Sequence, residues 1–332
     1  MKIAINGFGR IGRLVFKLLE EEKDMEVVAI NDLTDAEQLA YLLKYDSTHR
    51  SYKEEVTYDG DYLITSKSKV KVLSEKDPTN LPWKEMDIDL VIESTGHFNK
   101  KEDAEKHLEA GAKKVIISAP SSKELKTIVY GVNEEILDGT ENIISAASCT
   151  TNCLAPVLKL LNDNYGIEKG YMTTIHAYTN DQVLLDVSHK KGAKSRRGRA
   201  GAQNIIPTST GAASAIGNVI PELKGKLDGS AMRVPVPTGS VIDLTLELNK
   251  NVTTEEINKL FETNQNSTLK FTLDPIVSSD IIGSTYGSIV DGLLTSVLEV
   301  EGKQLVKIVS WYDNEMGYTA QMIRTAKHWL NK

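Results

Sequence analysis

The first 32 residues carry a pattern that few folds can accommodate. A short apolar, β-branched stretch at residues 2–6 runs directly into Gly7-Phe8-Gly9-Arg10-Ile11-Gly12. An amphipathic helix over 11–19 follows, and a second apolar stretch at 27–30 ends at Asn31-Asp32, with Asp32 twenty positions beyond Gly12. A GxGxxG sequence between a strand and a helix, with an acid after the second strand, is the fingerprint of a dinucleotide-binding βαβ unit. The alternative is a glycine turn in a βαβ unit that binds no ligand.

Each part of this fingerprint has a physical role. Gly7 and Gly9 allow a tight turn and a close approach of the backbone to a pyrophosphate, which would rest on the helix N-terminus. Gly12 lets helix and strand pack closely, and Asp32 can accept hydrogen bonds from ribose hydroxyls. Because the Asp32 carboxylate would repel a 2′-phosphate, the predicted cofactor is NAD.

A second feature, Ser148-Cys149-Thr150-Thr151-Asn152-Cys153, predicts a nucleophile. Leu154, Val157, Leu158 and Leu161 recur at helical spacing, and Ser148 is a good N-cap. Cys149 then lies in the first turn, where exposed N–H groups and the helix dipole favour a thiolate. Pro156 predicts a kink or an irregular second turn, and Cys153 reads as a buried hydrophobic residue.

A dinucleotide site, an activated cysteine and a histidine at position 176 suggest one chemistry. A thiolate adds to an aldehyde, the hemithioacetal gives hydride to NAD, and a thioester remains for a second nucleophile. The other five histidines lie in polar or loop-like contexts and are predicted to be solvated or capping residues; they are His49, His97, His107, His189 and His328.

At this point the chain resembles a known family over essentially its whole length: the phosphorylating glyceraldehyde-3-phosphate dehydrogenases. The matching segments occur in the family's order and are INGFGRIGR, INDLTD, LLKYDSTH, DPTNLPW, ESTGHF, GAKKVIISAP, AASCTTNCLAP, IHAYTNDQ, STGAA, KLDGSAMRVPVPTGS and SWYDNEMGY. The resemblance implies that the chain oxidises glyceraldehyde 3-phosphate, with inorganic phosphate and NAD, to 1,3-bisphosphoglycerate. It also implies a homotetramer.

The resemblance further assigns His176 as the partner of Cys149, and it implies cofactor and substrate contacts. Asn314 is expected to bind the nicotinamide carboxamide, and Lys76 stands where family members often carry arginine. The remaining implied cofactor contacts are Arg10, Ile11, Thr95, Gly96 and Ser118. The implied substrate-phosphate ligands are Thr179 and Arg233, and those of the attacking phosphate are Ser148, Thr150, Thr210 and Gly211.

The basic run at 190–199 has two interpretations. It can be a solvated loop with incidental nucleic-acid affinity, or, by resemblance, a loop at a subunit interface beside the cofactor, from which Arg197 faces the phosphate region. Ser188, just before it, stands where NAD-specific members commonly carry proline and NADP-accepting forms carry serine.

The pattern changes near Cys149, which predicts two domains. Before it, strands at 89–93, 115–118 and 127–130 alternate with helices such as 101–110, as in a doubly wound, mostly parallel Rossmann-like sheet. After it, alternating strands at 241–248, 293–300 and 304–311 predict an α+β domain on an antiparallel sheet, and Thr253 opens a helix with a capping box. The expected class is α/β, with an NAD-binding domain over 1–148 and a catalytic domain over 149–316. By resemblance the helix at 317–332 packs back on the first domain.

Composition excludes some alternatives. The chain of 332 residues has two cysteines and a net charge of −7. CxxxC is not a usual zinc spacing, so no metal is expected, and two cysteines favour a reducing compartment, here the cytoplasm, over a disulfide framework. The charge gives no support for a dedicated nucleic-acid site, and the sequence predicts neither a membrane span nor a signal peptide.

Two rival functions remain open. One is a different phosphorylated aldehyde, such as erythrose 4-phosphate, processed by the same residues. The other is a non-enzymatic redox sensor that uses Cys149 and bound NAD, for which a phosphate cradle would have no purpose.

Overall fold

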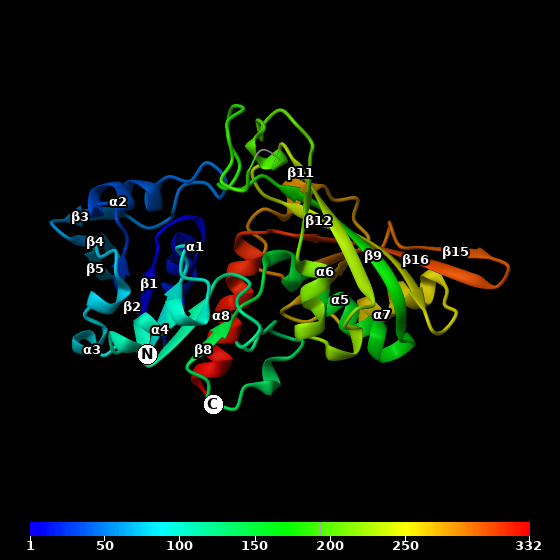
Figure 1. Cartoon of the computed structure of the whole chain (residues 1–332), viewed down its shortest axis with the longest axis horizontal. Helices are drawn as coiled ribbons and strands as arrows, with labels where there is room; N and C mark the ends of the chain where they lie inside the picture. The colour runs from blue at the N-terminus through cyan, green and yellow to red at the C-terminus, as the bar shows by residue number, and fades with distance from the viewer. Residues whose placement is uncertain (193) are drawn as a thin grey trace. The chain divides into compact units, whose positions relative to one another are not determined.

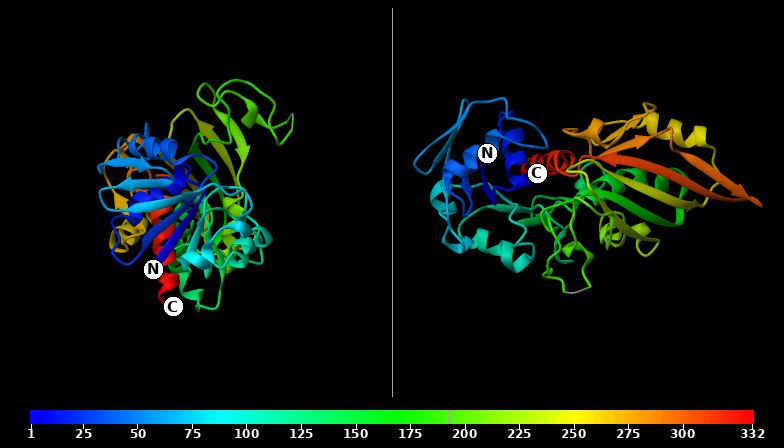
Figure 2. Two further views of the ribbon diagram at one scale, coloured as in Figure 1. Left: turned by 90° about the vertical axis from the view of Figure 1, so that its left-hand side faces the viewer. Right: turned by 90° about the horizontal axis from the view of Figure 1, so that it is seen from above.

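The computed structural model describes residues 1–192 and 194–332, so Ala193 of the basic run lies outside the described residues. The chain forms two compact units (Figure 1). Unit 1 comprises Met1–Ile128, Glu134–Ser148 and Met322–Lys332, and unit 2 comprises Val129–Asn133 and Cys149–Gln321. Both termini therefore belong to unit 1, and they lie near each other in all three views (Figures 1 and 2).

Unit 1 is built on an eight-stranded sheet with the order β3-β4-β5-β2-β1-β6-β7-β8. Its strands are β1 (Lys2–Asn6), β2 (Glu26–Asn31), β3 (Val56–Asp59), β4 (Tyr62–Thr65), β5 (Lys69–Leu73), β6 (Leu90–Glu93), β7 (Lys114–Ile117) and β8 (Ile143–Ser145). Strand β1 pairs in parallel with both β2 and β6, whereas β4 runs antiparallel to β3 and β5. The strands that follow β1 are added first on one side of it (β2 and β5) and then on the other (β6, β7 and β8). Doubly wound sheets bind ligands at such a switch point.

Helices complete the core of unit 1. They are α1 (Arg10–Leu19), α2 (Ala36–Lys44), α3 (Trp83–Met86), α4 (Lys101–Glu109) and the last turns of α8 (Met316–Leu330), with 3-10 turns at Pro78–Asn80 and Glu134–Ile136. Within unit 1, α8 (red in Figure 2) is held by its charged and aromatic side chains. Lys327 pairs with Glu22 at 2.6 Å, and the ammonium of Lys114 lies 4.5 Å from the ring centroid of the fully buried Trp329.

One predicted strand of this unit is wrong. Residues 127–130 form only an isolated bridge, between Thr127 and Ser145, and the last strand of the sheet is β8. The N–H of Ile128 donates to the carbonyl of Ser145, but the chain then turns, with the N–H groups of Val132 and Asn133 bonded to the carbonyl of Val129. A β-branched run was thus a correct indicator of burial and a wrong indicator of strand length.

Unit 2 is built on a second eight-stranded sheet with the order β10-β11-β9-β12-β16-β14-β13, and β15 pairs with β16. Its strands are β9 (Ile167–Ala177), β10 (Ile206–Ser209), β11 (Leu227–Val234), β12 (Ser240–Leu248), β13 (Leu269–Thr272), β14 (Ser288–Asp291), β15 (Ser296–Val300) and β16 (Lys303–Tyr312). The predicted class, a Rossmann-like sheet followed by an α+β unit, is confirmed. The second sheet is mixed rather than antiparallel throughout, because β9 pairs in parallel with β11, and β13 with β14.

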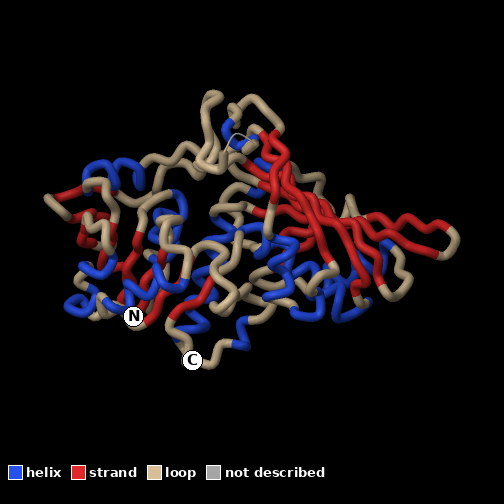
Figure 3. The backbone as a smooth tube through the Cα atoms, in the orientation of Figure 1, coloured by secondary structure: helices blue, strands red, loops and turns tan. Residues whose placement is uncertain are grey.

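Helices α5 (Cys149–Tyr165), α6 (Ala212–Ala215) and α7 (Thr254–Thr263) lie beneath the strands of this sheet (Figure 3). Short 3-10 turns occur at Arg196–Gly198, Ile216–Asn218, Pro221–Leu223 and Ser278–Ile281. Helix α5 continues through Pro156, and α7 has the predicted capping box, in which Thr253 and Glu256 exchange side-chain and backbone hydrogen bonds.

The predicted hairpin after residue 293 is also present. Val300 pairs with Lys303 across a two-residue turn, in which Glu301 and Gly302 have φ of 50° and 75°. Two positive φ angles match the right-handed twist of the flanking strands. Among the described residues, no helix has the length and apolar character needed to cross a bilayer.

Candidate active site

Cys149 and His176 are brought together by a helix start and a strand end. Cys149 is the first residue of α5, and His176 is the penultimate residue of β9, 4% exposed. The Cys149 Sγ lies 3.3 Å from the His176 Nε2. Ala147, two residues before the cysteine, has a φ of 59°, a left-handed conformation that non-glycine residues adopt at a cost. The backbone is therefore locally strained at Ala147, in the turn that places Cys149 at the helix start.

The hydrogen bonds around the ring define which nitrogen of His176 carries the proton. Its Nδ1 lies 2.7 Å from the carbonyl oxygen of Ala177, which can only accept. The Arg233 Nη1, which can only donate, also lies 3.0 Å from Nδ1, but its two hydrogens are directed to Ala177 and Thr179. Nδ1 is therefore the donor, and the lone pair of Nε2 faces the sulfur. In this tautomer His176 is arranged to take a proton from Cys149 or from an oxygen bound to the same carbon.

Opposing effects act on the charges of this pair. Burial raises the pKa of the Cys149 thiol, and burial together with Arg233 lowers the pKa of His176 to about 3. The positive charge of Arg233 lowers the pKa of Cys149, and the N–H groups at the start of α5 also favour a thiolate. Burial thus favours a neutral imidazole, and the cation and helix start favour the sulfur anion.

Arg233 connects this pair to a polar cluster. Its Nη1 donates to the carbonyl of Ala177 at 2.9 Å and to the hydroxyl of Thr179 at 3.0 Å. The buried Nε of Arg233 has no hydrogen-bond partner in the described part of the chain. Because an arginine donor left unpaired in a buried site is costly, this nitrogen fits an anionic ligand.

Asp181 lies on the other side of Thr179. Its carboxylate accepts from the Thr179 hydroxyl at 2.5 Å and forms an ion pair with Arg197. These contacts, although opposed by burial, hold the pKa of Asp181 below its usual range. The structure therefore places Thr179, Arg233 and Arg197, all predicted from the sequence, in one network. Sequence reasoning gave Asp181 no role, although it lies within the matched IHAYTNDQ segment.

Asn314 is held in a defined orientation. Its Oδ1 accepts hydrogen bonds from Ser240 at 2.8 Å and from Thr238 at 3.3 Å, and the residue is 5% exposed. The carbonyl side of the amide is thereby satisfied within the protein, which leaves the Nδ2 group to donate elsewhere. Ser240 also accepts from the N–H of Ala177 at 3.1 Å, so one hydroxyl connects Asn314 with the strand end that carries His176. Neither Ser240 nor Thr238 was predicted.

The remaining expected phosphate ligands differ in exposure: Thr150 is buried, whereas Thr210 is partly buried and Gly211 is exposed. The hydroxyl of Thr150, 5% exposed, lies 2.9 Å from that of Tyr312, which also contacts Thr174 at 2.8 Å. Thr210 accepts from the N–H of Ala212, and Gly211 is the N-cap of α6. Ser148 directly precedes α5.

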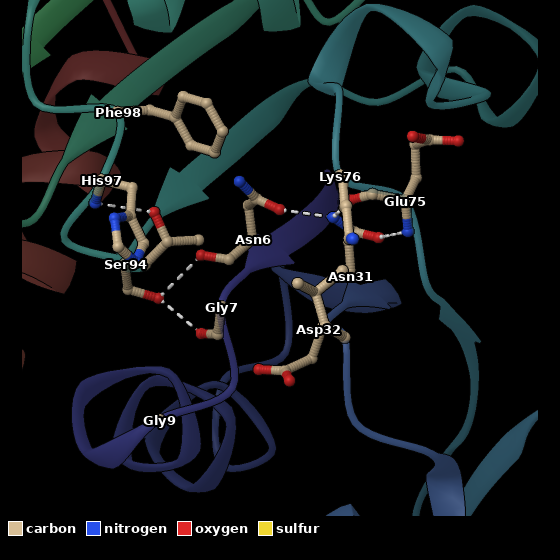
Figure 4. Close-up of a pocket in the computed structure, with 12 residues that line it drawn as sticks. Asn6, Gly7, Gly9, Asn31, Asp32, Glu75, Lys76, Ser94, His97 and Phe98 are labelled. Atoms are coloured by element: carbon tan, nitrogen blue, oxygen red, sulfur yellow. Dashed lines mark hydrogen bonds between the residues drawn. The ribbon is translucent and has the colours of Figure 1, made fainter.

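A second site lies in unit 1, at the carboxyl ends of its central strands. A cavity of about 390 Å³ is lined there by Asn6, Gly7, Gly9, Asn31, Asp32, Leu33, Glu75, Lys76, Ser94, Thr95, His97 and Phe98 (Figure 4). Of the predicted cofactor residues, Gly7, Gly9, Asp32, Lys76 and Thr95 line this cavity. Asp32 accepts from the N–H groups of Phe8 and Thr34, one on each carboxylate oxygen, which leaves lone pairs on both oxygens.

The glycines of the turn differ in what surrounds them. A Cβ at Gly12 would lie 2.1 Å from the carbonyl oxygen of Gly7, and Gly7 itself has a φ of 90° and abuts the backbone of Thr95. A Cβ at Gly9 would meet nothing within 4 Å. The packing role predicted for Gly12 therefore has a structural basis, and the space at Gly9 fits close approach by a ligand such as a pyrophosphate.

The other predicted cofactor residues surround the same strand ends. Arg10 and Ile11 form the first turn of α1, and the Arg10 guanidinium pairs with Asp46 at 2.8 Å. Gly96 has a φ of 74°, and the N–H of Ser118 bonds to the carbonyl of Glu93. Ser118 is not part of the cavity lining in the described structure.

The prediction for His107 is wrong. This histidine is fully buried on α4 and contacts Glu93 and Trp83, whereas His97 is exposed at the cavity, as predicted for a solvated residue. The prediction also fails for His49, whose side chain is only 4% exposed: its Nδ1 accepts from Arg10 at 3.1 Å and its backbone N–H donates to Asp46. The ring of His189 bonds to the carbonyl of Asp181. The His328 ring lies 3.9 Å from Glu135.

Two family models match the chain. One, described as "Glyceraldehyde 3-phosphate dehydrogenase, NAD binding domain", matches residues 1–101, and the other, "Glyceraldehyde 3-phosphate dehydrogenase, C-terminal domain", matches residues 148–314. A glyceraldehyde-3-phosphate dehydrogenase of Clostridium pasteurianum is 59% identical over 327 residues, which cover 98% of each chain. One from Clostridium acetobutylicum is 58% identical over 98% of this chain and 97% of its own, and one from Streptococcus pyogenes is 56% identical over 99% and 98%.

Proposed function

The chain belongs to the glyceraldehyde-3-phosphate dehydrogenase family, and from this premise we propose how its own residues perform the family's reaction. The protein is an NAD-dependent oxidoreductase of glycolysis that converts glyceraldehyde 3-phosphate and phosphate to 1,3-bisphosphoglycerate. We assign cofactor binding to residues 1–148 and catalysis to residues 149–316, with 317–332 packed on the first domain. The observation that carries the catalytic assignment is the 3.3 Å contact between Cys149 Sγ and His176 Nε2.

Cys149 is the nucleophile. Its sulfur adds to the aldehyde carbon while the thiol proton passes through His176 to the aldehyde oxygen, which gives a hemithioacetal; the N–H groups at the start of α5 stabilise negative charge on that oxygen. His176, unprotonated at neutral pH and held by Ala177 through Nδ1, takes the hydroxyl proton as the carbon loses its hydride. NAD, when bound, accepts that hydride. The carbon then carries a thioester to Cys149, which inorganic phosphate attacks; the acyl phosphate leaves and the sulfur anion is restored.

Cationic, hydroxyl and backbone groups bind the two phosphates. Arg233 and Thr179 hold the phosphate of the substrate, and the unpaired Nε of Arg233 supplies a donor for it. Ser148, Thr150, Thr210 and Gly211 hold the attacking phosphate, and Arg197 faces the same region. Because Asp181 binds both Thr179 and Arg197, an incoming phosphate competes with this carboxylate for the same donors.

NAD lies in the cavity of unit 1. Its pyrophosphate rests on the N–H groups of Arg10 and Ile11 at the start of α1, and Asp32 accepts from the adenosine ribose hydroxyls. Lys76, Thr95, Gly96 and Ser118 border the same region. Asn314, whose oxygen is already bonded to Ser240 and Thr238, donates from Nδ2 to the nicotinamide carboxamide and fixes the rotation of the ring.

The protein forms a homotetramer in the cytoplasm. The loop around the basic run exposes four large apolar side chains, a pattern that marks an interaction surface. They are Leu184, Leu185, Val187 and Ile205. Free Cys149 and Cys153 suit a reducing compartment. Light scattering on the purified protein tests the assembly, and a mass of one or two chains at micromolar concentration would exclude it.

The reaction is tested by NADH formation from glyceraldehyde 3-phosphate with and without phosphate. Steady turnover needs phosphate, and without it a single burst of NADH equal to the number of Cys149 sites is expected. Cys149→Ser should abolish oxidation while NAD still binds, because a serine hydroxyl is far less acidic than a thiol. Turnover above about 1% of the wild-type rate in this variant would remove Cys149 from its role. The specificity constants for glyceraldehyde 3-phosphate and erythrose 4-phosphate, measured side by side, establish which aldehyde is preferred.

A further inference from the structure

A buried chain of polar side chains lies directly behind the cavity of unit 1. Glu93, the last residue of β6, is 1% exposed and has no lysine or arginine among its hydrogen-bond partners in the described structure. One carboxylate oxygen, Oε1, accepts from the N–H of Thr95 at 2.8 Å and from its hydroxyl at 2.5 Å. The other oxygen, Oε2, contacts the amide of Asn6 at 2.6 Å and Nε2 of His107 at 3.1 Å.

Trp83 determines the direction of these bonds. Its indole Nε1, which can only donate, lies 3.0 Å from Nδ1 of His107. Nδ1 is therefore the acceptor, and Nε2 carries the hydrogen and donates to Glu93. All four groups that contact the carboxylate are then donors, so the acceptor-only form of Glu93 is fully satisfied.

The same polarity continues into the cavity wall. Because the Asn6 amide nitrogen donates to Glu93, its Oδ1 faces Asn31, whose Nδ2 donates to it at 2.7 Å (Figure 4). Asn31 in turn bonds both the N–H and the carbonyl of Glu75. Asn6, Asn31, Glu75 and Thr95 all line the cavity, so one carboxylate behind the wall orients groups that come from the ends of β1 and β2 and from the segments that follow β5 and β6.

We propose that Glu93 is a positioning residue for NAD binding, which it serves through Asn6 and Thr95, and that His107 and Trp83 fix its hydrogen bonds. The inference rests on the assignment of NAD to this cavity. Thr95 does not act as a hydrogen-bond donor to the cofactor in this proposal, because its N–H and its hydroxyl hydrogen both bond to Glu93. Phe98, which lines the cavity, packs edge-on against the His107 ring with centroids 6.4 Å apart, so the same histidine supports the wall by packing.

Glu93→Gln replaces one acceptor oxygen by a donor group, which must then face either the donors of Thr95 or those of Asn6 and His107. In the full-length enzyme we expect the KM and Kd for NAD to rise by about tenfold or more, as for other supporting partners of a binding site. The kcat at saturating NAD should stay within about twofold of the wild-type value, because Cys149 and His176 lie in the other unit.

A second variant tests the same hydrogen-bond network without altering Glu93, so the test does not depend on whether Glu93→Gln folds. Trp83→Phe removes only the indole donor, and we expect it to raise the KM for NAD by about two- to tenfold. Trp329→Phe is the matched control: Trp329 is equally buried in unit 1, but its Nε1 has no hydrogen-bond partner in the described residues. It should leave the KM for NAD unchanged.

The two substitutions should also be non-additive, because Trp83 acts through the carboxylate that Glu93→Gln has already altered. An equal KM for Trp83→Phe and Trp329→Phe, or additive effects in the double variant, would overturn the proposal. So would a kcat that falls as much as kcat/KM. Asp32→Ala serves as the marker of the cavity: if it leaves NAD affinity unchanged, the cofactor site itself is misassigned, whereas a loss there with no effect at Trp83 rejects the positioning role alone.

Discussion

Arg233 has two roles in the proposed site, one toward the substrate phosphate and one toward the Cys149 thiol. It donates to Thr179 and Ala177 and lies 3.0 Å from Nδ1 of His176. It contributes a charged donor to the substrate phosphate, and its charge also lowers the pKa of the Cys149 thiol. A substitution of Arg233 should therefore weaken the binding of phosphorylated substrates and should also change the reactivity of Cys149 toward every aldehyde. Comparing two substrates separates them.

Arg233→Leu should raise the KM for glyceraldehyde 3-phosphate by about tenfold or more relative to its effect on unphosphorylated glyceraldehyde. A charged hydrogen bond contributes roughly 1.5–3 kcal/mol, which corresponds to that factor. Both aldehydes are measured at saturating NAD and phosphate. Equal losses for the two substrates would place the substrate phosphate elsewhere.

His176 makes stability depend on pH in a definite direction. The pKa of His176 is lowered from 6.5 to about 3 in the folded protein. Between these pH values the histidine is protonated in the unfolded chain and neutral in the folded protein. The stabilisation is complete above pH 6.5 and is lost as the pH falls toward 3. Between pH 7 and pH 5 we expect the wild type to lose roughly 1–2 kcal/mol more than His176→Asn. Urea midpoints at the two pH values measure this, with Cys149→Ser as a control that keeps the histidine. A loss of the same size in His176→Asn would show that other groups titrate.

Asp32 should enforce the preference for NAD. The 2′-phosphate of NADP would be repelled by the Asp32 carboxylate, and the ribose 2′-hydroxyl that donates to this carboxylate would be missing. The wild-type kcat/KM should therefore be higher for NAD than for NADP. Asp32→Ala should raise kcat/KM for NADP by about tenfold or more. Ser188 offers a hydroxyl that, by resemblance, can reach this region from a neighbouring subunit, and Asp32→Ala/Ser188→Pro is the matched comparison. NADP turnover that is the same with serine and proline would remove Ser188 from cofactor selection, and wild-type parity between the two cofactors would contradict the charge argument.

Among the elements, the turn between β1 and α1 imposes the strictest geometry. Gly12→Ala should destabilise unit 1 by about 1–3 kcal/mol and weaken NAD binding, because its Cβ has no room beside the Gly7 carbonyl. Gly9→Ala is the control, and it should unfold at the wild-type urea concentration since its Cβ enters open space. If Gly9→Ala binds NAD as tightly as the wild type, the pyrophosphate does not approach the backbone there.

Local patterns predicted most of these elements, and long-range contacts explain where they did not. The GxGxxG turn, the helix after Cys149, the capping box at Thr253 and the hairpin around Gly302 all depend on neighbours in sequence. His107 was predicted to be solvated because lysine and glutamate surround it on α4. Its partners, Glu93 and Trp83, come from other elements, so no local signal marks it as buried. Asp181 and Ser240 were missed for the same reason, since their importance arises from the strand ends beside which they lie.

Across the whole molecule, the core of unit 1 depends on residues at both ends of the sequence. Trp329 is fully buried there, under the ammonium of Lys114, although the 173 residues of Cys149–Gln321, all in unit 2, separate its segment from the earlier part of unit 1. Trp329→Ala should therefore destabilise unit 1 by about 3–5 kcal/mol. Thermal unfolding with and without NAD measures this: the variant should melt earlier and still be stabilised by the cofactor. An unchanged melting temperature would show that α8 contributes little to unit 1.

This path of the chain sets an order for its biosynthesis. Domains of a growing polypeptide generally fold from the N-terminus while the ribosome is still adding residues. Here the strands that emerge first lack Trp329 and the rest of Met322–Lys332 until all of unit 2 has been made. Until Met322–Lys332 has been translated, after unit 2, the nascent unit 1 has part of its interior exposed to chaperones and proteases. A stop codon directly before residue 322 would thus leave the whole of unit 2 encoded and yet remove part of the core of unit 1.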